Sequence, residues 1–379
     1  MRKLEIINNH SVLATRTHWK LDLGVGRKKG WKLPLLFMLG LVCSTVSAAV
    51  KITDLGTLGG AWSMALDIND NDQVICESSL SGDQEVHICL YENGRLLDIS
   101  NLYGLAPLAN YAVWGNAINS RGQIAANISN GHAVILSRGQ VIDLGLGGDY
   151  STSLDINDFG QAVGYYSSDG LNRAFSYNHG TVTLLGSNGP QAVSFAAGVN
   201  NSGVVVGSAA DSYTIPNHAF IYSNGVTTNL APFGNSESYA RGINNIGQVV
   251  GEYYDVKRAA FHAFIYHEGV FTDIGDAESP LTVAYGTNDS GQIVGTTWVL
   301  RNDSCRDCIE YETHAFFYEN GALIDLNTLL PSNSEWKLFE AYAINNKGKI
   351  VGYGLVHGQL HAFLLQLVFP SAQELRSTQ

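Results

Sequence analysis

Six histidines recur at one position of a repeated segment, and imidazole nitrogens are common metal ligands. The set is His87, His132, His218, His262, His314 and His361. A metal site needs ligands that converge on one point, whereas equivalent positions of successive repeats are spread apart. We therefore predict no metal site from the histidines and interpret their ring nitrogens as groups that tie adjacent strands together.

Oxygen-bearing side chains alternate in DINDND (67–72), a pattern typical of calcium loops. The candidate ligands are Asp67, Asn69 and Asn71. Other copies of the segment break the alternation, with Phe159 in one and Gly242 in another. The two interpretations are a single calcium site and an Asx-type turn that needs no metal.

The cysteines predict disulfides. Cys76 stands where five other repeats have Gly, and Cys89 stands where five have Phe, so one cross-strand pair has changed together. This favours a disulfide between these two residues. Cys305 and Cys308, in CRDC, are predicted to form a local disulfide, with a redox-active pair as the alternative.

Catalytic patterns are weak in this sequence. No carboxylate pair or Ser–His–Asp set stands out, and GTLGG (56–60) and GLGG (145–148) are not followed by helices that would make them phosphate loops. Aromatic residues instead recur beside the first strand of each repeat. They are Trp62, Tyr111, Trp114, Tyr150, Phe195, Tyr239, Tyr285 and Trp336. Such rings can stack on sugars or anchor a peptide, and the alternative is that most of them pack between sheets.

A sevenfold repeat must position all of these residues. INNIGQVVG (243–251) recurs in similar form, with steps of 38 to 57 residues. The anchoring residues are Asn69, Asn119, Asn157, Asn200, Asn244, Asn288 and Asn345. In each turn we expect the Asn side chain to bond the backbone ahead, and Gly three residues later to close a hairpin. Each repeat holds four short runs rich in β-branched and aromatic residues, which excludes helical repeats.

Small residues stand four and two positions before most of these asparagines, as Ala240 and Gly242 do before Asn244. Strict alternation predicts that such a pair shares one face of a strand. Small side chains suit the innermost strands of a seven-bladed β-propeller, where the blades converge. The last repeat lacks its fourth strand, and VKITDLG (50–56) resembles the missing one. We therefore predict seven four-stranded blades closed by the N-terminal strand.

The N-terminal segment and the overall charge bear on location and partners. Lysines precede an apolar run (33–46) and small residues follow it, which predicts a signal peptide over 1–48. We place the propeller at 49–369 and a C-terminal tail at 370–379. Beyond residue 48, 14 basic side chains face 32 acidic ones, a net charge near −18. Such a surface repels nucleic acid and anionic lipid, so we expect neither partner and no stable membrane insertion.

The segments HAFIY (218–222 and 262–266), HAFFY (314–318) and DLGTLGG (54–60) resemble the HAF-repeat proteins, predicted extracellular bacterial repeat proteins. The resemblance covers nearly all of 50–366. It implies export and a repeated β-architecture, and it implies no defined activity or catalytic residue.

Together these observations predict a secreted or periplasmic monomer that is not an enzyme and needs no cofactor. Its expected function is to bind an extracellular carbohydrate or protein ligand. The alternatives are a propeller-fold glycan hydrolase or lyase, and a structural or adhesion repeat protein.

Overall fold

Antiparallel β-sheets built from consecutive strands make up the structure. The computed structural model describes residues 49–83, 85–102, 117–128, 131–186, 191–212, 216–230, 236–301 and 310–368, all of which belong to one compact unit, Val46–Gln379. The predicted signal peptide and C-terminal tail lie outside the described residues. Within those residues, neither of the two short helices has the length and apolar character needed to cross a membrane.

Among the described residues, five sheets have four strands each. The first contains β6 (Ala117–Ile118), β7 (Ile124–Asn127), β8 (Ala133–Ser137) and β9 (Gln140–Asp143). The second contains β10 (Tyr150–Ile156), β11 (Ala162–Ser168), β12 (Leu171–Asn178) and β13 (Thr181–Leu185). The third contains β14 (Val193–Val199), β15 (Val205–Ala210), β16 (His218–Ser223) and β17 (Val226–Asn229). The fourth contains β18 (Ser238–Ile243), β19 (Val249–Asp255), β20 (Ala260–His267) and β21 (Val270–Asp273). The fifth contains β22 (Thr282–Thr287), β23 (Ile293–Leu300), β24 (Tyr311–Glu319) and β25 (Ala322–Asp325).

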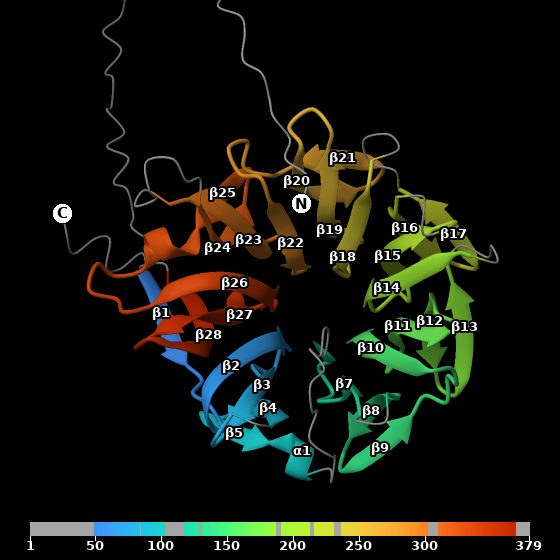
Figure 1. Ribbon diagram of the computed structural model, residues 1–379, viewed down its shortest axis with the longest axis horizontal. Coiled ribbons are helices and arrows are strands. Elements are labelled where there is room, and N and C mark those ends of the chain that lie inside the picture. The colour runs from blue at the N-terminus through green and yellow to red at the C-terminus, as the bar shows by residue number, and fades with distance from the viewer. Residues whose placement is uncertain are drawn as a thin grey trace, which may run out of the picture. The chain divides into compact units, whose positions relative to one another are not determined.

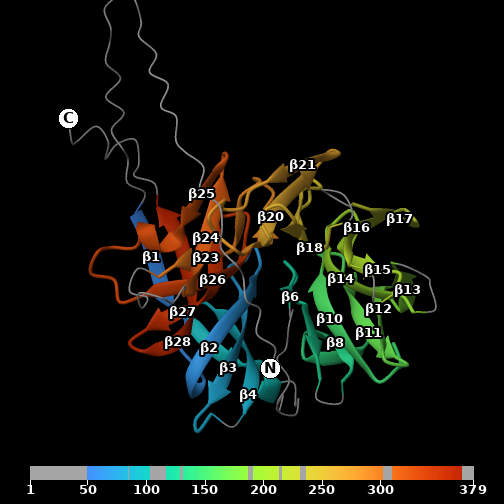
Figure 2. The same cartoon turned by 45° about the horizontal axis from the view of Figure 1, so that its top comes forward.

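The sixth sheet has eight strands and brings the two ends of the described chain together. Its first half is β2 (Gly59–Ile68), β3 (Val74–Leu80), β4 (Val86–Glu92) and β5 (Arg95–Asp98). Its second half is β26 (Lys337–Ile344), β27 (Lys349–Val356), β28 (Gln359–Val368) and β1 (Ala49–Asp54). One parallel pair, Trp62 with Leu360, joins the halves, and β1 runs antiparallel to β28. β28 therefore has β27 along one edge and β1 along the other, and both views show the blue strand β1 beside the red strands of this half (Figures 1 and 2). The helices α1 (Ile99–Leu102) and η1 (Leu326–Leu329) follow β5 and β25.

The repeated asparagines form the predicted turns. In the fourth sheet Asn244 Oδ1 accepts the Gln248 N–H at 2.8 Å, and Gly247 takes a left-handed φ of 82°. The first turn has Asp72 in place of Gly, and it adopts the same region with φ 65°. An aspartate tolerates this conformation better than most residues do, so the turn keeps its shape.

The seven turns also bond to one another. Each Asn side chain donates from Nδ2 to the main-chain oxygen of the next anchoring Asn, over 2.7 to 3.1 Å. The last of these bonds runs from Asn345 back to Asn69. The bonds therefore form a continuous ring, which we call the asparagine ring, around a cavity of about 190 Å³.

Glycine and phenylalanine form the repeated core contact. Gly251 on β19 lies opposite Phe264 on β20, and four other sheets or half-sheets repeat this pair. A Cβ on Gly251 would lie 1.9 Å from the Tyr239 carbonyl oxygen, so no larger residue fits there. The five phenylalanines are at most 1% exposed. They are Phe175, Phe220, Phe264, Phe316 and Phe363.

A repeated serine connects neighbouring sheets. The Ala219 N–H in the third sheet donates to Ser238 Oγ in the fourth at 3.0 Å, and equivalent bonds recur elsewhere. The same bond, 2.9 Å long, runs from the Ala362 N–H on β28 to Ser63 Oγ on β2. The contact between the two ends of the chain thus repeats the contact between consecutive sheets.

The first strand of each sheet or half-sheet lies innermost (Figure 1). A β-bulge interrupts six of these strands, namely β2, β10, β14, β18, β22 and β26. In β18 the bulge falls between Ala240, opposite Gly251, and Gly242, opposite Val250. Consecutive partners on β19 point to opposite faces, so the expectation that Ala240 and Gly242 share a face is wrong. Small residues remain necessary, because a Cβ on Gly242 would lie 2.8 Å from the main-chain oxygen of Tyr285.

Candidate functional site

The repeated histidines pair with aspartates of the neighbouring strand. His262 Nδ1 lies 3.1 Å from Asp273 Oδ1, and His314 Nδ1 lies 2.7 Å from Asp325 Oδ2. The remaining pairs are His87–Asp98, His132–Asp143 and His361–Asp54. His218 instead contacts the Ser236 carbonyl oxygen at 3.2 Å. The His–Asp bonds tie the third strand of a sheet or half-sheet to its fourth, whereas the His218 bond reaches the segment before β18. No group of three potential metal-ligating side chains forms among the described residues.

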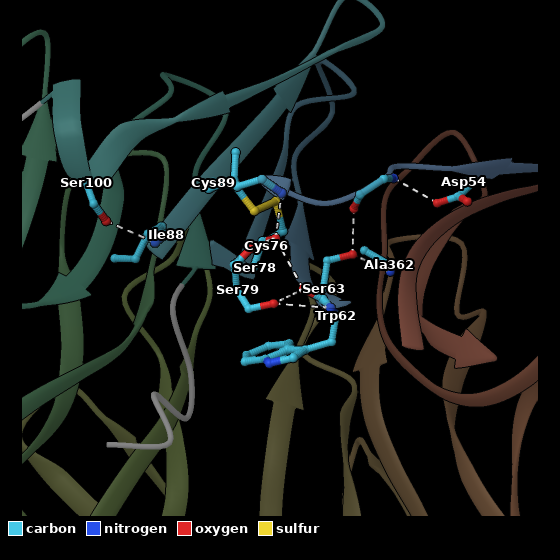
Figure 3. The surroundings of a disulfide bond; sticks show 12 residues. Asp54, Trp62, Ser63, Cys76, Ser78, Ser79, Ile88, Cys89, Ser100 and Ala362 are labelled. Atoms are coloured by element: carbon cyan, nitrogen blue, oxygen red, sulfur yellow. Dashed lines mark hydrogen bonds between the residues drawn. A yellow bond between two sulfur atoms is a disulfide. The ribbon is translucent and has the colours of Figure 1, made fainter. Parts of the chain in front are cut away.

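Cys76 and Cys89 form a disulfide between β3 and β4, where they are direct cross-strand partners (Figure 3). They occupy the places of the Gly–Phe pair of the other sheets. Ser63, which accepts the N–H of Ala362, lies beside this bond (Figure 3). Cys305 and Cys308 lie outside the described residues.

The side chains of the three candidate calcium ligands form hydrogen bonds with main-chain groups of the protein. Asp67 accepts the N–H groups of Ile68 and Ile118, both at 2.8 Å. Asn69 Oδ1 accepts the N–H groups of Asn71 and Gln73, which is the Asx-type turn. Asn71 Nδ2 donates to the Ser120 carbonyl oxygen at 2.7 Å.

The bulge positions carry different side chains in different sheets. Leu66, Leu154 and Ala197 occupy the bulge in three innermost strands, and Arg241, Tyr285 and Tyr342 occupy it in β18, β22 and β26. A bulge re-aims its side chain without entering the hydrogen-bond ladder. Three adjacent sheets therefore present one guanidinium and two phenol rings at equivalent places.

Arg241 forms an ion pair with a residue of its own sheet. Its Nε lies 3.0 Å from both carboxylate oxygens of Glu252, a buried residue on β19. Its guanidinium carbon lies 5.3 Å from the ring centre of Tyr239, which is the cross-strand partner of Glu252. Burial raises the pKa of Glu252, and the charge of Arg241 opposes this shift. The guanidinium is thus fixed while its side chain stays 43% exposed.

The tyrosines continue this arrangement into the next two sheets. The ring centres of Tyr285 and Tyr342 are 5.2 Å apart, and those of Tyr342 and Tyr353 are 6.0 Å apart. Glu340 lies opposite Tyr353 on the paired strand. Burial raises the pKa of Glu340, while the hydroxyl groups of the three tyrosines favour its charged form. We call the whole set the inner wall: Tyr239, Arg241, Glu252, Tyr285, Glu340, Tyr342 and Tyr353.

The predicted aromatic residues divide between several environments. Tyr239 and Tyr285 belong to the inner wall. Tyr150 and Phe195 both contact Tyr165, with ring centres 5.7 and 4.9 Å from it. Trp336 packs against a hydrophobic cluster and contacts Phe363 at 6.2 Å. Trp62 lies beside Ser79 (Figure 3), whereas Tyr111 and Trp114 fall outside the described residues.

Five members of the inner wall were missed from the sequence. They are Arg241, Glu252, Glu340, Tyr342 and Tyr353. A usable signal existed for two of them, because Glu252 and Tyr353 each follow the repeated Gly of a second strand. The residue after that Gly changes from sheet to sheet while the Gly itself repeats, which indicates that the fold does not fix the residue type there.

Comparisons with known proteins bear on the fold. No protein-family model and no curated protein matches the chain. A puromycin-hydrolysing peptidase of Mycobacterium tuberculosis matches with a TM-score of 0.50 and 10% identity, over 82% of this chain and 54% of that one. A puromycin hydrolase gives 0.50 and 10%, over 80% and 51%. The β-propeller domain of the trilobed protease of Pyrococcus furiosus gives 0.47 and 11%, over 83% and 98%.

This chain spans about half the length of the two puromycin-hydrolysing proteins. At such identities the likeness concerns the fold alone. The chain is all-β, and a β-propeller domain is among the solved structures that it resembles.

Proposed function

We propose that this chain is a seven-bladed β-propeller, closed by β1, that binds a glycan outside the cytoplasm without catalysing a reaction. The blade count treats the eight-stranded sheet as two blades, because the strand pairing between its halves consists of one residue pair, Trp62 with Leu360. The pairing of β1 with β28 supports the proposed closure. The resemblance to HAF-repeat proteins remains part of this proposal.

The inner wall carries the functional part of the proposal. Sugars offer hydroxyl groups for hydrogen bonds and C–H faces for aromatic rings. The wall supplies phenol hydroxyls, the Glu340 carboxylate and the Arg241 guanidinium side by side. The Arg241–Glu252 pair and the ring contacts hold these groups in place before a ligand arrives, which lowers the entropic cost of binding.

The disulfide and the charge support the proposed location. Disulfides persist mainly in oxidising compartments, so the Cys76–Cys89 bond favours the periplasm or the extracellular space. The net charge of −12 disfavours nucleic acid as the partner.

A glycan array probed with the purified chain tests this function. We expect a sugar signal that Tyr342→Phe weakens by about tenfold, because the substitution removes one hydrogen-bonding hydroxyl. Tyr177→Phe is the matched control. Tyr177 lies near the C-terminal end of β12, packs against a core cluster and is not part of the inner wall. An array without signal, or equal loss in both variants, contradicts the proposal.

A glycan hydrolase or lyase is the second candidate, because Glu340 and Glu252 place two carboxyl groups on the same wall. The sugars that bind would be incubated with the protein and analysed for shortened products. Product formation that Glu340→Gln abolishes would establish the enzyme instead.

A further inference from the structure

A second cavity lies in the fourth sheet, apart from the inner wall. Its volume is about 660 Å³, within the range of small-molecule sites, and it borders the hairpin that joins β19 to β20. Tyr253, Tyr254, Asp255, Lys257 and Arg258 line it together with Asp273. The hairpin follows β19 at the end away from the Asn244 turn, so the cavity opens at the end opposite the asparagine ring.

The polar groups of this cavity are joined in one network. Arg258 Nη1 lies 2.7 Å from Asp255 Oδ2 and 3.4 Å from Asp273 Oδ2. The Tyr253 hydroxyl donates to Asp273 Oδ2 at 3.1 Å. Asp273 is also the repeated partner of His262. The aspartate that bonds to His262 thus also holds the guanidinium of Arg258, and the Arg258 side chain remains 46% exposed.

The hairpin departs from the repeat in its charge. The equivalent hairpins after β11 and β27 turn through Asp169–Gly170 and His357–Gly358. Here the connection is Val256–Ala259 and contains Lys257 and Arg258 in succession. Its closure needs neither cation, since Ala259 takes the left-handed φ of 53°. The structure gives the Lys257 ammonium no ion-pair partner among the described residues.

The charges in the cavity define the ligand. Two carboxylates balance two cations, so a doubly charged phosphate or sulfate gains little attraction. A singly charged carboxylate fits better, because the fork of Arg258 matches its geometry and Lys257 adds a positive charge. Asp255 can accept bonds from hydroxyl groups, and Tyr254, fixed by a ring contact of 5.2 Å with Phe261, offers an aromatic ring to a sugar.

We propose that this cavity binds an acidic sugar unit, a uronic acid, through Lys257 and Arg258. The site is separate from the inner wall and does not depend on a glycan binding there. It adds a class of ligand that the overall negative charge of the chain would otherwise repel.

Calorimetric titration of the full chain with methyl glucuronide, methyl glucoside and glucose 6-phosphate tests the proposal. We expect the glucuronide to bind about tenfold more tightly than the other two, as one charge-assisted interaction predicts. Lys257→Gln should remove this preference, and Arg258→Lys, which keeps the charge but loses the fork, should reduce it. Lys51→Gln, which removes an exposed charge from β1, should leave it unchanged.

Several results would overturn the proposal. They are no binding of the glucuronide, equal affinity for the glucoside, tighter binding of the phosphate, and an unchanged preference in Lys257→Gln with its normal melting temperature. Loss of glucuronide binding in Tyr342→Phe would place that ligand on the inner wall instead. An empty glycan array with intact glucuronide binding would contradict the proposed function alone.

Discussion

The side chain of Asn345 donates a hydrogen bond to the main-chain oxygen of Asn69, 276 residues earlier in the sequence. The bond is 3.1 Å long and matches the six bonds between consecutive anchoring asparagines. One type of contact thus serves both as the local link between neighbouring sheets and as the link between the two ends of the chain.

Asn244→Asp should break the asparagine ring. A carboxylate cannot donate to the Asn288 oxygen, which Asn244 Nδ2 reaches at 2.7 Å, and it would bring negative charge against a buried carbonyl group. We expect a loss of about 3 kcal/mol in the free energy of unfolding. Urea unfolding measures it, with Asn224→Asp in an exposed turn as the control. Equal stability of the two variants would show that the ring bond contributes nothing.

Replacement of the disulfide by the residues of the other sheets tests the repeated core contact. The double variant Cys76→Gly with Cys89→Phe recreates the pair seen in Gly251 and Phe264. It should be more stable than Cys76→Gly alone, which leaves a cavity and a free thiol. Against the wild type it should lose about 2–4 kcal/mol, the usual contribution of a disulfide. The prediction fails if the double variant melts below the single one.

Deletion of residues 49–58 should expose β28 as an open sheet edge. The deletion removes all of β1, including Asp54, the partner of His361. An unpaired edge strand invites association with other chains, so we expect aggregation and a lower melting temperature. Light scattering and size-exclusion chromatography measure this, and deletion of 370–379 is the control. A truncated protein that stays monomeric with unchanged melting would refute closure by β1.

Glu77→Gln should make stability less sensitive to pH. Glu77 is 5% exposed, its Oε1 has no hydrogen-bond partner, and burial raises its pKa to about 8 from 4.5. Between these values the folded protein keeps a proton that the unfolded chain releases. The favourable contribution is therefore complete below 4.5 and is lost as pH rises through 8.

The glutamine variant lacks this titration, so its stability relative to the wild type should grow between about pH 5 and about pH 9. Thermal melts over that range measure the trend, with the exposed Glu278→Gln as the control. Parallel pH profiles for Glu77→Gln and the wild type would contradict a buried, protonated carboxyl group.

The repeated features were predictable from the sequence because seven copies show which residues every unit needs. Asn244, Gly247 and Gly251 were assigned to turns and strands in this way, and the correlated change at Cys76 and Cys89 led to their disulfide. The bond from Asn244 to Asn288 was not predicted, because it depends on how closely adjacent sheets approach.

The inner wall was harder to predict for two reasons. The bulge at Arg241 breaks the twofold alternation on which strand analysis depends, so the facing of the side chains was misjudged. In addition, the recurrence of aromatic residues pointed to Trp336, which packs against the core, and carried no signal for Glu340 or Arg241. Polar residues that differ between repeats leave no periodic trace.

The bulge at the same place in six of the innermost strands, β2, β10, β14, β18, β22 and β26, also has an evolutionary consequence. Since its residue takes no part in the ladder, Leu66 in one unit and Arg241 in another are exchanged without altering the turns or the Gly–Phe core. Duplication of such a unit yields a new copy in which a single codon is free to diverge. The descendants of one ancestral repeat can therefore acquire different ligands while they inherit the same scaffold.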